Sequence, residues 1–162
     1  MKPIVLYYTN YDTTKMAAES IAKYFKINEI SNVNDFNSDK INEYDTIFLG
    51  SNIRAFQIAK PVQTILRTIK KAGTNQKVFL FLCCGTVDPN GIDKAMKLQA
   101  KYSNVQDFGV FGGRMTFADL SDADKELIRV GYEMMKRKIE DYDDFKEEEV
   151  IKFCKKIEKE ME

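Results

Sequence analysis

The chain contains 162 residues, and 44% of them are hydrophobic, which is enough for one domain of ordinary size with a substantial core. Lys plus Arg and Asp plus Glu both number 25, and this charge balance argues against a nucleic-acid partner. Histidine is absent, so any catalysis has to come from carboxylates, Lys, Tyr, Cys or a borrowed cofactor.

The N-terminal quarter of the chain predicts a strand, a helix and a second strand. Residues 3–8 are continuously apolar, which is typical of a strand buried on both faces. The helix that follows has one apolar stripe, formed by Ala17, Ala18, Ile21, Ala22 and Phe25. Residues 27–30 predict a short strand, and the Asn/Asp/Ser-rich residues 31–43 predict a loop or a weak helix.

The middle of the chain repeats this alternation. Residues 46–50 predict a third buried strand that ends at a glycine. A helix is expected to start near Pro61, because apolar residues follow at helical spacing: Val62, Ile65, Leu66 and Ile69. Residues 78–83 predict a fourth strand, which Gly85 ends. A further helix is expected around Ile92, Ala95, Met96 and Gln99.

The C-terminal third predicts one strand and two helices. Residues 105–112 predict a fifth strand, which ends at Gly112 and Gly113. The first helix carries Leu127, Ile128, Gly131, Met134 and Met135. The last helix carries Val150, Ile151, Cys154, Ile157 and Met161, with three glutamates in its first turn.

Apolar strands that alternate with helices predict an α/β fold whose parallel sheet is covered on both sides. With five strands, the order 2-1-3-4-5 of a flavodoxin-like three-layer sandwich is the leading expectation. Neither a repeat nor a low-complexity linker interrupts the pattern, so we expect residues 1–162 to form a single domain. In such sheets ligands bind beyond the carboxyl ends of the strands. Three predicted loops meet there, namely residues 9–14, 51–59 and 84–91.

The first of these loops has the chemistry of a phosphate site. Hydroxyl and amide side chains separate the first strand from the first helix. Threonine hydroxyls and backbone N–H groups at a helix N-terminus bind phosphate without needing a lysine. The alternative is ordinary N-capping of the helix by Asp12 or Thr13, and the two roles are compatible.

These residues resemble the flavodoxin family, and the resemblance covers nearly the whole chain. Matching positions of the phosphate-loop pattern are occupied by Val5, Leu6, Tyr7, Thr9, Thr14, Ala18 and Ile21. Asp12 stands where the family usually has glycine. Residues 44–45, 50–54 and 112–115 resemble the branch that includes the quinone-dependent protoporphyrinogen dehydrogenase.

The resemblance implies non-covalent FMN bound by the three loops. Residues of the first loop would surround its phosphate: Thr9, Asn10, Tyr11, Asp12, Thr13 and Thr14. Two further sets would flank its ring: Ser51, Asn52, Ile53, Arg54, Ala55 and Phe56 in the second loop, and Cys84, Gly85, Thr86, Val87 and Asp88 in the third. Asp12 is a repulsive neighbour for a phosphate unless its carboxylate caps the helix or points to water.

Several of these residues have alternative interpretations. Arg54 is either a solvated arginine in a surface ion pair or a cation near the flavin edge that becomes negative on reduction. Phe56 either stacks on the flavin or packs on the domain, and Asp88 either accepts a flavin N–H or leaves that role to backbone carbonyls. Arg114, Met115 and Phe117 follow the fifth strand and are candidates for the site entrance, with Arg114 as a candidate contact for a substrate carboxylate.

The cysteines indicate a reduced, cytoplasmic protein without a metal site. Cys83, Cys84 and Cys154 have no metal-ligand spacing, and adjacent cysteines are poor disulfide partners. The simpler interpretation is that Cys83 packs in the core as a small apolar residue at the end of a buried strand. The alternative is that Cys83 and Cys84 form a redox pair. The chain lacks an apolar run long enough to span a bilayer and a signal-peptide pattern.

Three functions remain open. The first is an FMN electron carrier working with a redox partner protein or a quinone-type acceptor. The second is an FMN-dependent oxidoreductase of the protoporphyrinogen dehydrogenase type, although the corresponding segment, residues 116–124, is short and acidic here. The third is a flavodoxin-fold interaction module that has lost FMN through Asp12.

Overall fold

A computed structural model describes residues 2–54, 57–73, 75–85 and 104–161. Its main sheet contains five parallel strands in the order β2-β1-β3-β5-β6. These are β1 (Pro3–Tyr8), β2 (Ile30–Asn32), β3 (Thr46–Arg54), β5 (Lys77–Cys84) and β6 (Val105–Gly112). A two-residue strand, β4 (Gln57–Ile58), pairs antiparallel with the end of β3. The predicted order of the five parallel strands is therefore confirmed.

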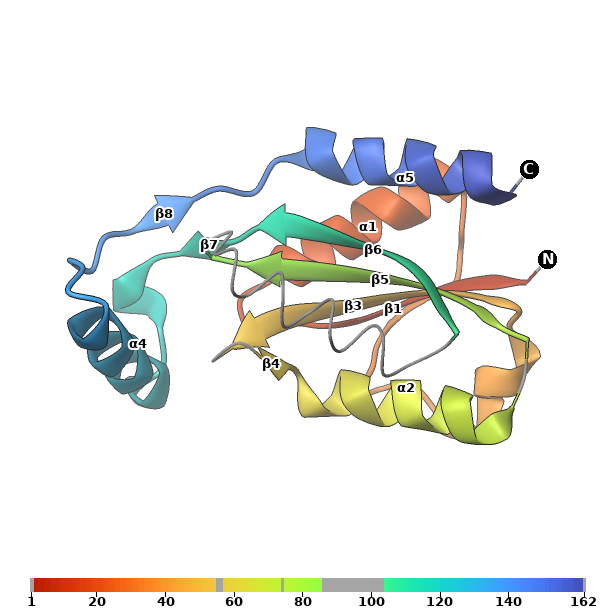
Figure 1. Ribbon diagram of the computed structural model, residues 1–162, viewed down its shortest axis with the longest axis horizontal. Helices are drawn as coiled ribbons and strands as arrows, with labels where there is room; N and C mark the ends of the chain where they lie inside the picture. The colour runs from red at the N-terminus through yellow and green to blue at the C-terminus, as the bar shows by residue number, and fades with distance from the viewer. Residues whose placement is uncertain (1, 55–56, 74, 86–103, 162) are drawn as a thin grey trace.

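Helices cover both faces of this sheet (Figure 1). Helices α1 (Thr13–Phe25) and α5 (Glu147–Met161) lie on one face, and α2 (Lys60–Ala72) lies on the other with the short 3-10 helix η1 (Ser38–Glu43). Alternate residues of each strand point to opposite faces. The face under α2 is aliphatic, whereas the face under α1 is rich in phenylalanine, with Phe48 and Phe79 stacked at 5.4 Å between ring centroids. Alanines on α1 leave room for these rings.

Two predicted boundaries are wrong, each for a local reason. The second strand was expected at residues 27–30 but spans Ile30–Asn32, because the N–H of Ile27 still bonds to the carbonyl of Ala22 and closes the end of α1. Residues 51–54 were expected in a loop but continue β3, and Ser51 and Asn52 lie opposite Leu82 and Cys83 of β5. The predicted helix around residues 92–99 lies outside the described residues.

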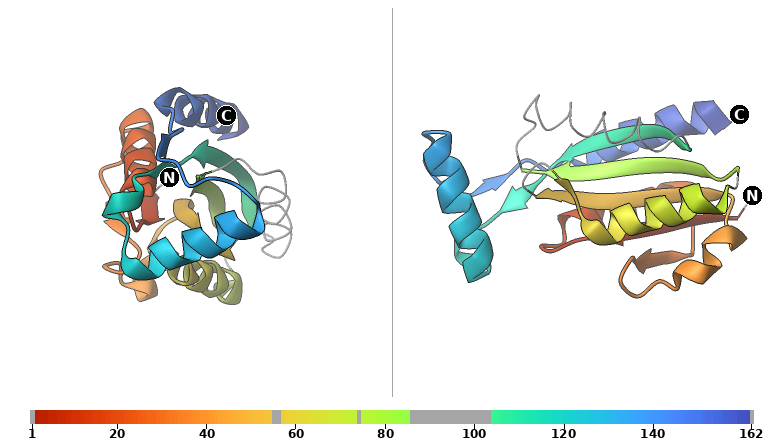
Figure 2. Two further views of the ribbon diagram at one scale, coloured as in Figure 1. Left: turned by 90° about the vertical axis from the view of Figure 1, so that its left-hand side faces the viewer. Right: turned by 60° about the horizontal axis from the view of Figure 1, so that its bottom comes forward.

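The chain leaves the three layers after β6. Strands β7 (Arg114–Met115) and β8 (Tyr142–Asp143) form an antiparallel ribbon, and between them come the 3-10 helix η2 (Phe117–Asp119) and helix α4 (Asp122–Met134). Figure 1 shows α4 beyond the carboxyl ends of the strands, and Figure 2 shows it running across the strand direction. None of the α4 residues is buried. Within the described ranges, no helix is long and apolar enough to span a membrane.

Gly112, the last residue of β6, allows the β7–β8 ribbon to pack closely where it leaves the main sheet. Its replacement is expected to be destabilising. A Cβ atom at Gly112 would collide with the backbone of Asp144, so Gly112→Ala is expected to lower the free energy of unfolding by about 1–3 kcal/mol. A Cβ atom at Gly131 in α4 would meet no atom within 4 Å, so Gly131→Ala is the matched control. The control is expected to be neutral or stabilising by up to about 1 kcal/mol. Urea titrations of both variants test this, and equal losses would contradict it.

Candidate cofactor site

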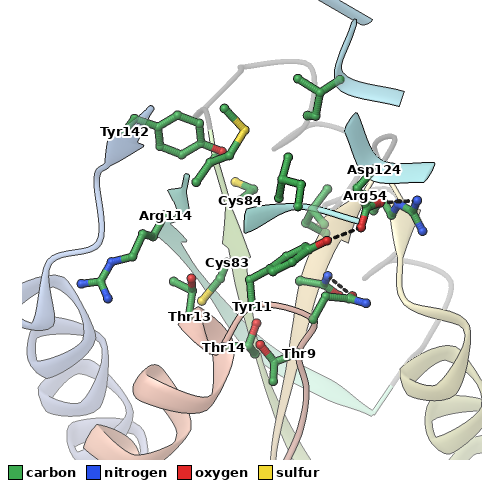
Figure 3. Close-up of a pocket in the computed structure, with 18 of the residues that line it drawn as sticks. Thr9, Tyr11, Thr13, Thr14, Arg54, Cys83, Cys84, Arg114, Asp124 and Tyr142 are labelled. Carbon is green, nitrogen blue, oxygen red and sulfur yellow. Dashed lines mark hydrogen bonds and ion pairs between the residues drawn. The ribbon is translucent and has the colours of Figure 1, made fainter. Parts of the chain in front are cut away.

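A pocket lies at the carboxyl ends of β1, β3 and β5, under α4 (Figure 3). Counted with its open mouth, the space between the lining residues is about 720 Å³. Residues from the loop after β1 form one side, and residues from α4 and the β7–β8 ribbon form the other. This is the edge of a parallel sheet where ligands are expected.

Most of the sequence-predicted site residues line this pocket: Thr9, Asn10, Tyr11, Thr13, Thr14, Asn52, Ile53, Arg54, Cys84 and Gly85. Ser51 and Asp12 are not among the lining residues. The Ser51 hydroxyl is buried, donates to the Asn52 carbonyl and accepts from the Ala59 N–H at 3.0 Å, so Ser51 ties the residue just before α2 to β3. Ala55, Phe56, Thr86, Val87 and Asp88 lie outside the described residues.

The N-terminus of α1 leaves hydrogen-bond donors at the pocket without a side-chain cap. Asp12 occupies the N-cap position but makes no side-chain capping bond. Thr14 is fully buried and lines the pocket, and its Oγ1 has no hydrogen-bond partner among the described residues. The thiol of Cys83 lies near Thr14 but does not form a hydrogen bond of ordinary geometry with it. A buried hydroxyl without a partner is unfavourable, and an anion in the pocket would satisfy it.

The backbone at Asp12 explains why glycine is usual at this position. Asp12 has φ 63°, in the left-handed region, where glycine has no steric penalty and aspartate is tolerated. Its side chain is exposed. N-capping by the Asp12 side chain, one of the two predicted alternatives, is therefore wrong, and the carboxylate is solvated instead.

An amide contact joins the first loop to the end of β3. The Asn52 side-chain amide donates to the Asn10 side-chain carbonyl at 2.7 Å. These two residues were assigned to separate loops of the predicted site, and the contact brings them together on one wall of the pocket.

Arg54 is connected to α4 through Asp124. The Arg54 guanidinium forms an ion pair with the Asp124 carboxylate, whose side chain is only 14% exposed. The same carboxylate accepts hydrogen bonds from the Tyr11 hydroxyl at 2.5 Å and the Ser121 hydroxyl at 3.0 Å. Asp124 thus links the loop after β1, the end of β3 and the start of α4 (Figure 3). Arg54 has the predicted ion pair, but the pair lies at the pocket rather than at an isolated loop tip.

The apolar side of the pocket was largely missed by sequence reasoning. It includes Met115, Leu120, Leu127, Ile128 and Tyr142, of which only Met115 was considered a neighbour of the site. These residues reach the pocket because the β7–β8 ribbon carries this part of the chain there, and no pattern in the sequence predicted that ribbon. Arg114 lines the pocket, but its Nε donates to Asp143 Oδ2 at 2.9 Å, and its guanidinium points away from the pocket centre in Figure 3.

Tyr142 and Cys83 are both neutral at physiological pH. The Tyr142 hydroxyl occupies the space where a Cβ atom of Gly85 would lie, and burial raises the pKa of Tyr142 to about 12. Burial likewise raises the pKa of the Cys83 thiol to about 12. Cys83, Cys84 and Cys154, all within the described part of the chain, form no disulfide. Cys83 is therefore a protonated core residue and not an activated redox thiol.

The pocket thus combines two chemical halves. Its floor offers threonine hydroxyls, amides and the N-terminus of α1, and its roof is apolar. A ligand that carries an anionic group at one end and a flat apolar ring system at the other fits this arrangement. FMN has this chemistry, and the unpartnered Thr14 hydroxyl is the observation that fits its phosphate.

Comparisons with known proteins agree with this fold. A family model described as flavodoxin domain matches residues 4–142. A flavodoxin from the domain Archaea has 20% sequence identity and a TM-score of 0.53, with 84% of this chain and 97% of that chain covered. Oxidised Flavodoxin 1 from Bacillus cereus has 16% identity and a TM-score of 0.52, with coverage of 86% and 100%.

A third solved structure contains a cofactor. It is a flavoprotein in complex with FMN from Lactobacillus acidophilus, with 22% identity, a TM-score of 0.52, and coverage of 67% of this chain and 92% of that chain. At these identities the solved structures share the fold with this chain. A comparison with curated proteins found no match.

Proposed function

This chain belongs to the flavodoxin domain family, and we propose that it binds FMN non-covalently and transfers electrons through it. The observation that carries the proposal is the buried, unpartnered Thr14 hydroxyl at the uncapped N-terminus of α1. The FMN-bound Lactobacillus acidophilus structure supports the choice of cofactor.

In this proposal the first loop holds the phosphate. Thr13 and Thr14 donate their hydroxyl groups, and the positive end of the α1 dipole stabilises the charge. Thr9, Asn10 and Tyr11 complete that side of the site. Bound FMN would supply the electron chemistry, and the protein would supply binding and electrostatics.

The ring system would lie toward the other end of the pocket. Ile53, Cys84 and Leu127 offer apolar surface there, and Asn52 and Arg54 offer donors. The acceptor is a redox partner protein or a quinone-type molecule, and the expected location is the cytoplasm.

A second candidate is an FMN-dependent oxidoreductase of the protoporphyrinogen dehydrogenase type. The observation in its favour is the apolar roof over the pocket, since Leu120, Leu127 and Ile128 shield the site from water on that side. A bound small-molecule acceptor would benefit from such shielding.

The visible spectrum of the purified chain, before and after addition of FMN, tests the proposal. We expect flavin absorption bands that remain with the protein after gel filtration, together with quenched flavin fluorescence. A chain that stays colourless with excess FMN would contradict the proposal and leave the non-redox interaction module as the function.

The Asp12 carboxylate is expected to weaken FMN binding. A like charge near the phosphate is unfavourable by about 1 kcal/mol at the surface, so Asp12→Asn and Asp12→Gly are each expected to tighten binding about fivefold. Asparagine removes the charge and still tolerates the left-handed backbone, so it separates charge from strain. Fluorescence titrations give the dissociation constant for FMN of both variants. If only Asp12→Gly binds more tightly, the backbone and not the charge limits affinity.

A further inference from the structure

Helix α4 carries an apolar stripe that the rest of the described chain does not cover. Leu127, Val130 and Met134 are 39%, 46% and 81% exposed. Their spacing places them on one face of the helix. A 13-residue helix with no buried residue is marginally stable by itself, because most helical stability in proteins comes from packing of an apolar face. A packing partner for this stripe is therefore expected.

The charges beside the stripe have opposite signs at its two ends. Asp119 in η2 and Asp122 in the first turn of α4 are exposed, whereas the Glu126 carboxylate is paired with Arg129 at 3.6 Å. Lys136, Arg137 and Lys138 are exposed just after its C-terminal end. Any partner that covers the stripe has to meet an acidic end and a basic end at the same time.

We propose that the partner is a second copy of this chain, packed antiparallel on α4 about a two-fold axis near Val130. This orientation places the acidic end of each helix against the basic end of the other, so the surface is complementary to itself. Asp122 at the start of α4 in each copy then faces the exposed basic segment 136–138 that follows α4 in the other.

The dimer is expected to be weak and reversible. One helix face is smaller than the roughly 800 Å² per partner of a standard interface. Pairing would hold α4 over the pocket through contacts separate from those of Asp124. Leu127 also lines the pocket, but the inference does not depend on FMN binding, because the other two stripe residues, Val130 and Met134, do not.

Sedimentation equilibrium of the full chain over a wide concentration range tests the pairing. We expect a monomer–dimer equilibrium that Val130→Lys or Met134→Lys abolishes. Ile30→Lys is the matched control, because Ile30 is also 37% exposed but lies on β2, at the edge of the main sheet, and it is expected to leave the dimer intact. A monomer at every concentration, as expected if the stripe serves a different protein or a membrane, would overturn the proposal. A dimer insensitive to Val130→Lys would also overturn it.

A charge-reversal experiment tests the predicted contacts. Asp122→Lys and Lys138→Asp are each expected to weaken self-association about tenfold, because each places like charges where the acidic end of one copy meets the basic end of the other. Mixing the two variants is expected to restore the dimer, since opposite charges then face each other again at both ends of the paired helices. Circular dichroism establishes that each variant remains folded. A mixture that stays monomeric would overturn the proposed pairing.

Discussion

Thr14→Val is expected to weaken FMN binding about ten- to hundredfold while leaving the FMN-free chain at least as stable as the wild type. The valine has nearly the same shape as threonine but lacks the hydroxyl. A hydrogen bond to a charged group contributes about 1.5–3 kcal/mol, which sets the size of the loss in affinity. In the FMN-free chain the same hydroxyl is buried without a partner, so its removal relieves an unfavourable desolvation.

These opposite effects distinguish a ligand-binding hydroxyl from a structural one. Fluorescence titration gives the dissociation constant for FMN, and urea titration gives the free energy of unfolding. Thr64→Val is the matched control, because Thr64 is exposed on α2, where its hydroxyl donates to the Lys60 carbonyl at 3.1 Å. The control is expected to bind FMN normally. A destabilised Thr14→Val chain with unchanged affinity would assign the hydroxyl a structural role.

Arg54→Ala is expected to lower the reduction potential of bound FMN, and Asp124→Asn is expected to raise it. A unit positive charge ~5 Å from a developing negative charge contributes roughly 3 kcal/mol at an effective dielectric of ~20. For one electron this corresponds to a shift of roughly 0.1 V. In this chain the Asp124 carboxylate pairs with Arg54 and offsets much of its field, so the Arg54→Ala shift should be well below that limit. In Asp124→Asn the neutral amide no longer offsets the positive charge of Arg54, so the reduction potential rises.

Potentiometric titration of both FMN-loaded variants measures these shifts. Glu126→Gln is a suitable control, because it removes a carboxylate charge from α4 at an exposed position outside the pocket lining. Asp124→Asn also removes an ion pair that joins α4 to β3, so thermal unfolding of the FMN-free variant should occur at a lower temperature. Equal potentials in the wild type and both variants would contradict a role for this ion pair at the flavin.

The sheet was predictable because the sequence of each central strand is itself mostly apolar, which indicates burial without any knowledge of distant contacts. Phe48 and Phe79 have apolar residues on both sides in the sequence, and such short apolar runs indicate a parallel sheet covered on both faces. The loop after β1 was predictable for a similar reason, since its hydroxyl residues end an apolar strand directly before a helix.

The rest of the site depends on contacts between distant segments. Asp124 reaches Tyr11 across more than a hundred residues of chain, and no local pattern predicts that contact. The polar side chains of Ser51 and Asn52 predicted a loop, but these two residues pair with β5 and continue β3. Asp12 suggested a helix cap, whereas its left-handed backbone accompanies a solvated side chain. Each of these outcomes is set by tertiary structure rather than by local propensity.

The central claim is that the N-terminus of α1 binds the phosphate of FMN. Parallel titrations of the FMN-free chain with FMN and with riboflavin, which lacks the phosphate, test it most directly. We expect FMN to bind at a one-to-one ratio, and riboflavin to bind at least about tenfold more weakly because it forfeits the charged hydrogen bonds. Equal affinities for the two flavins, or no binding of either, would contradict the claim.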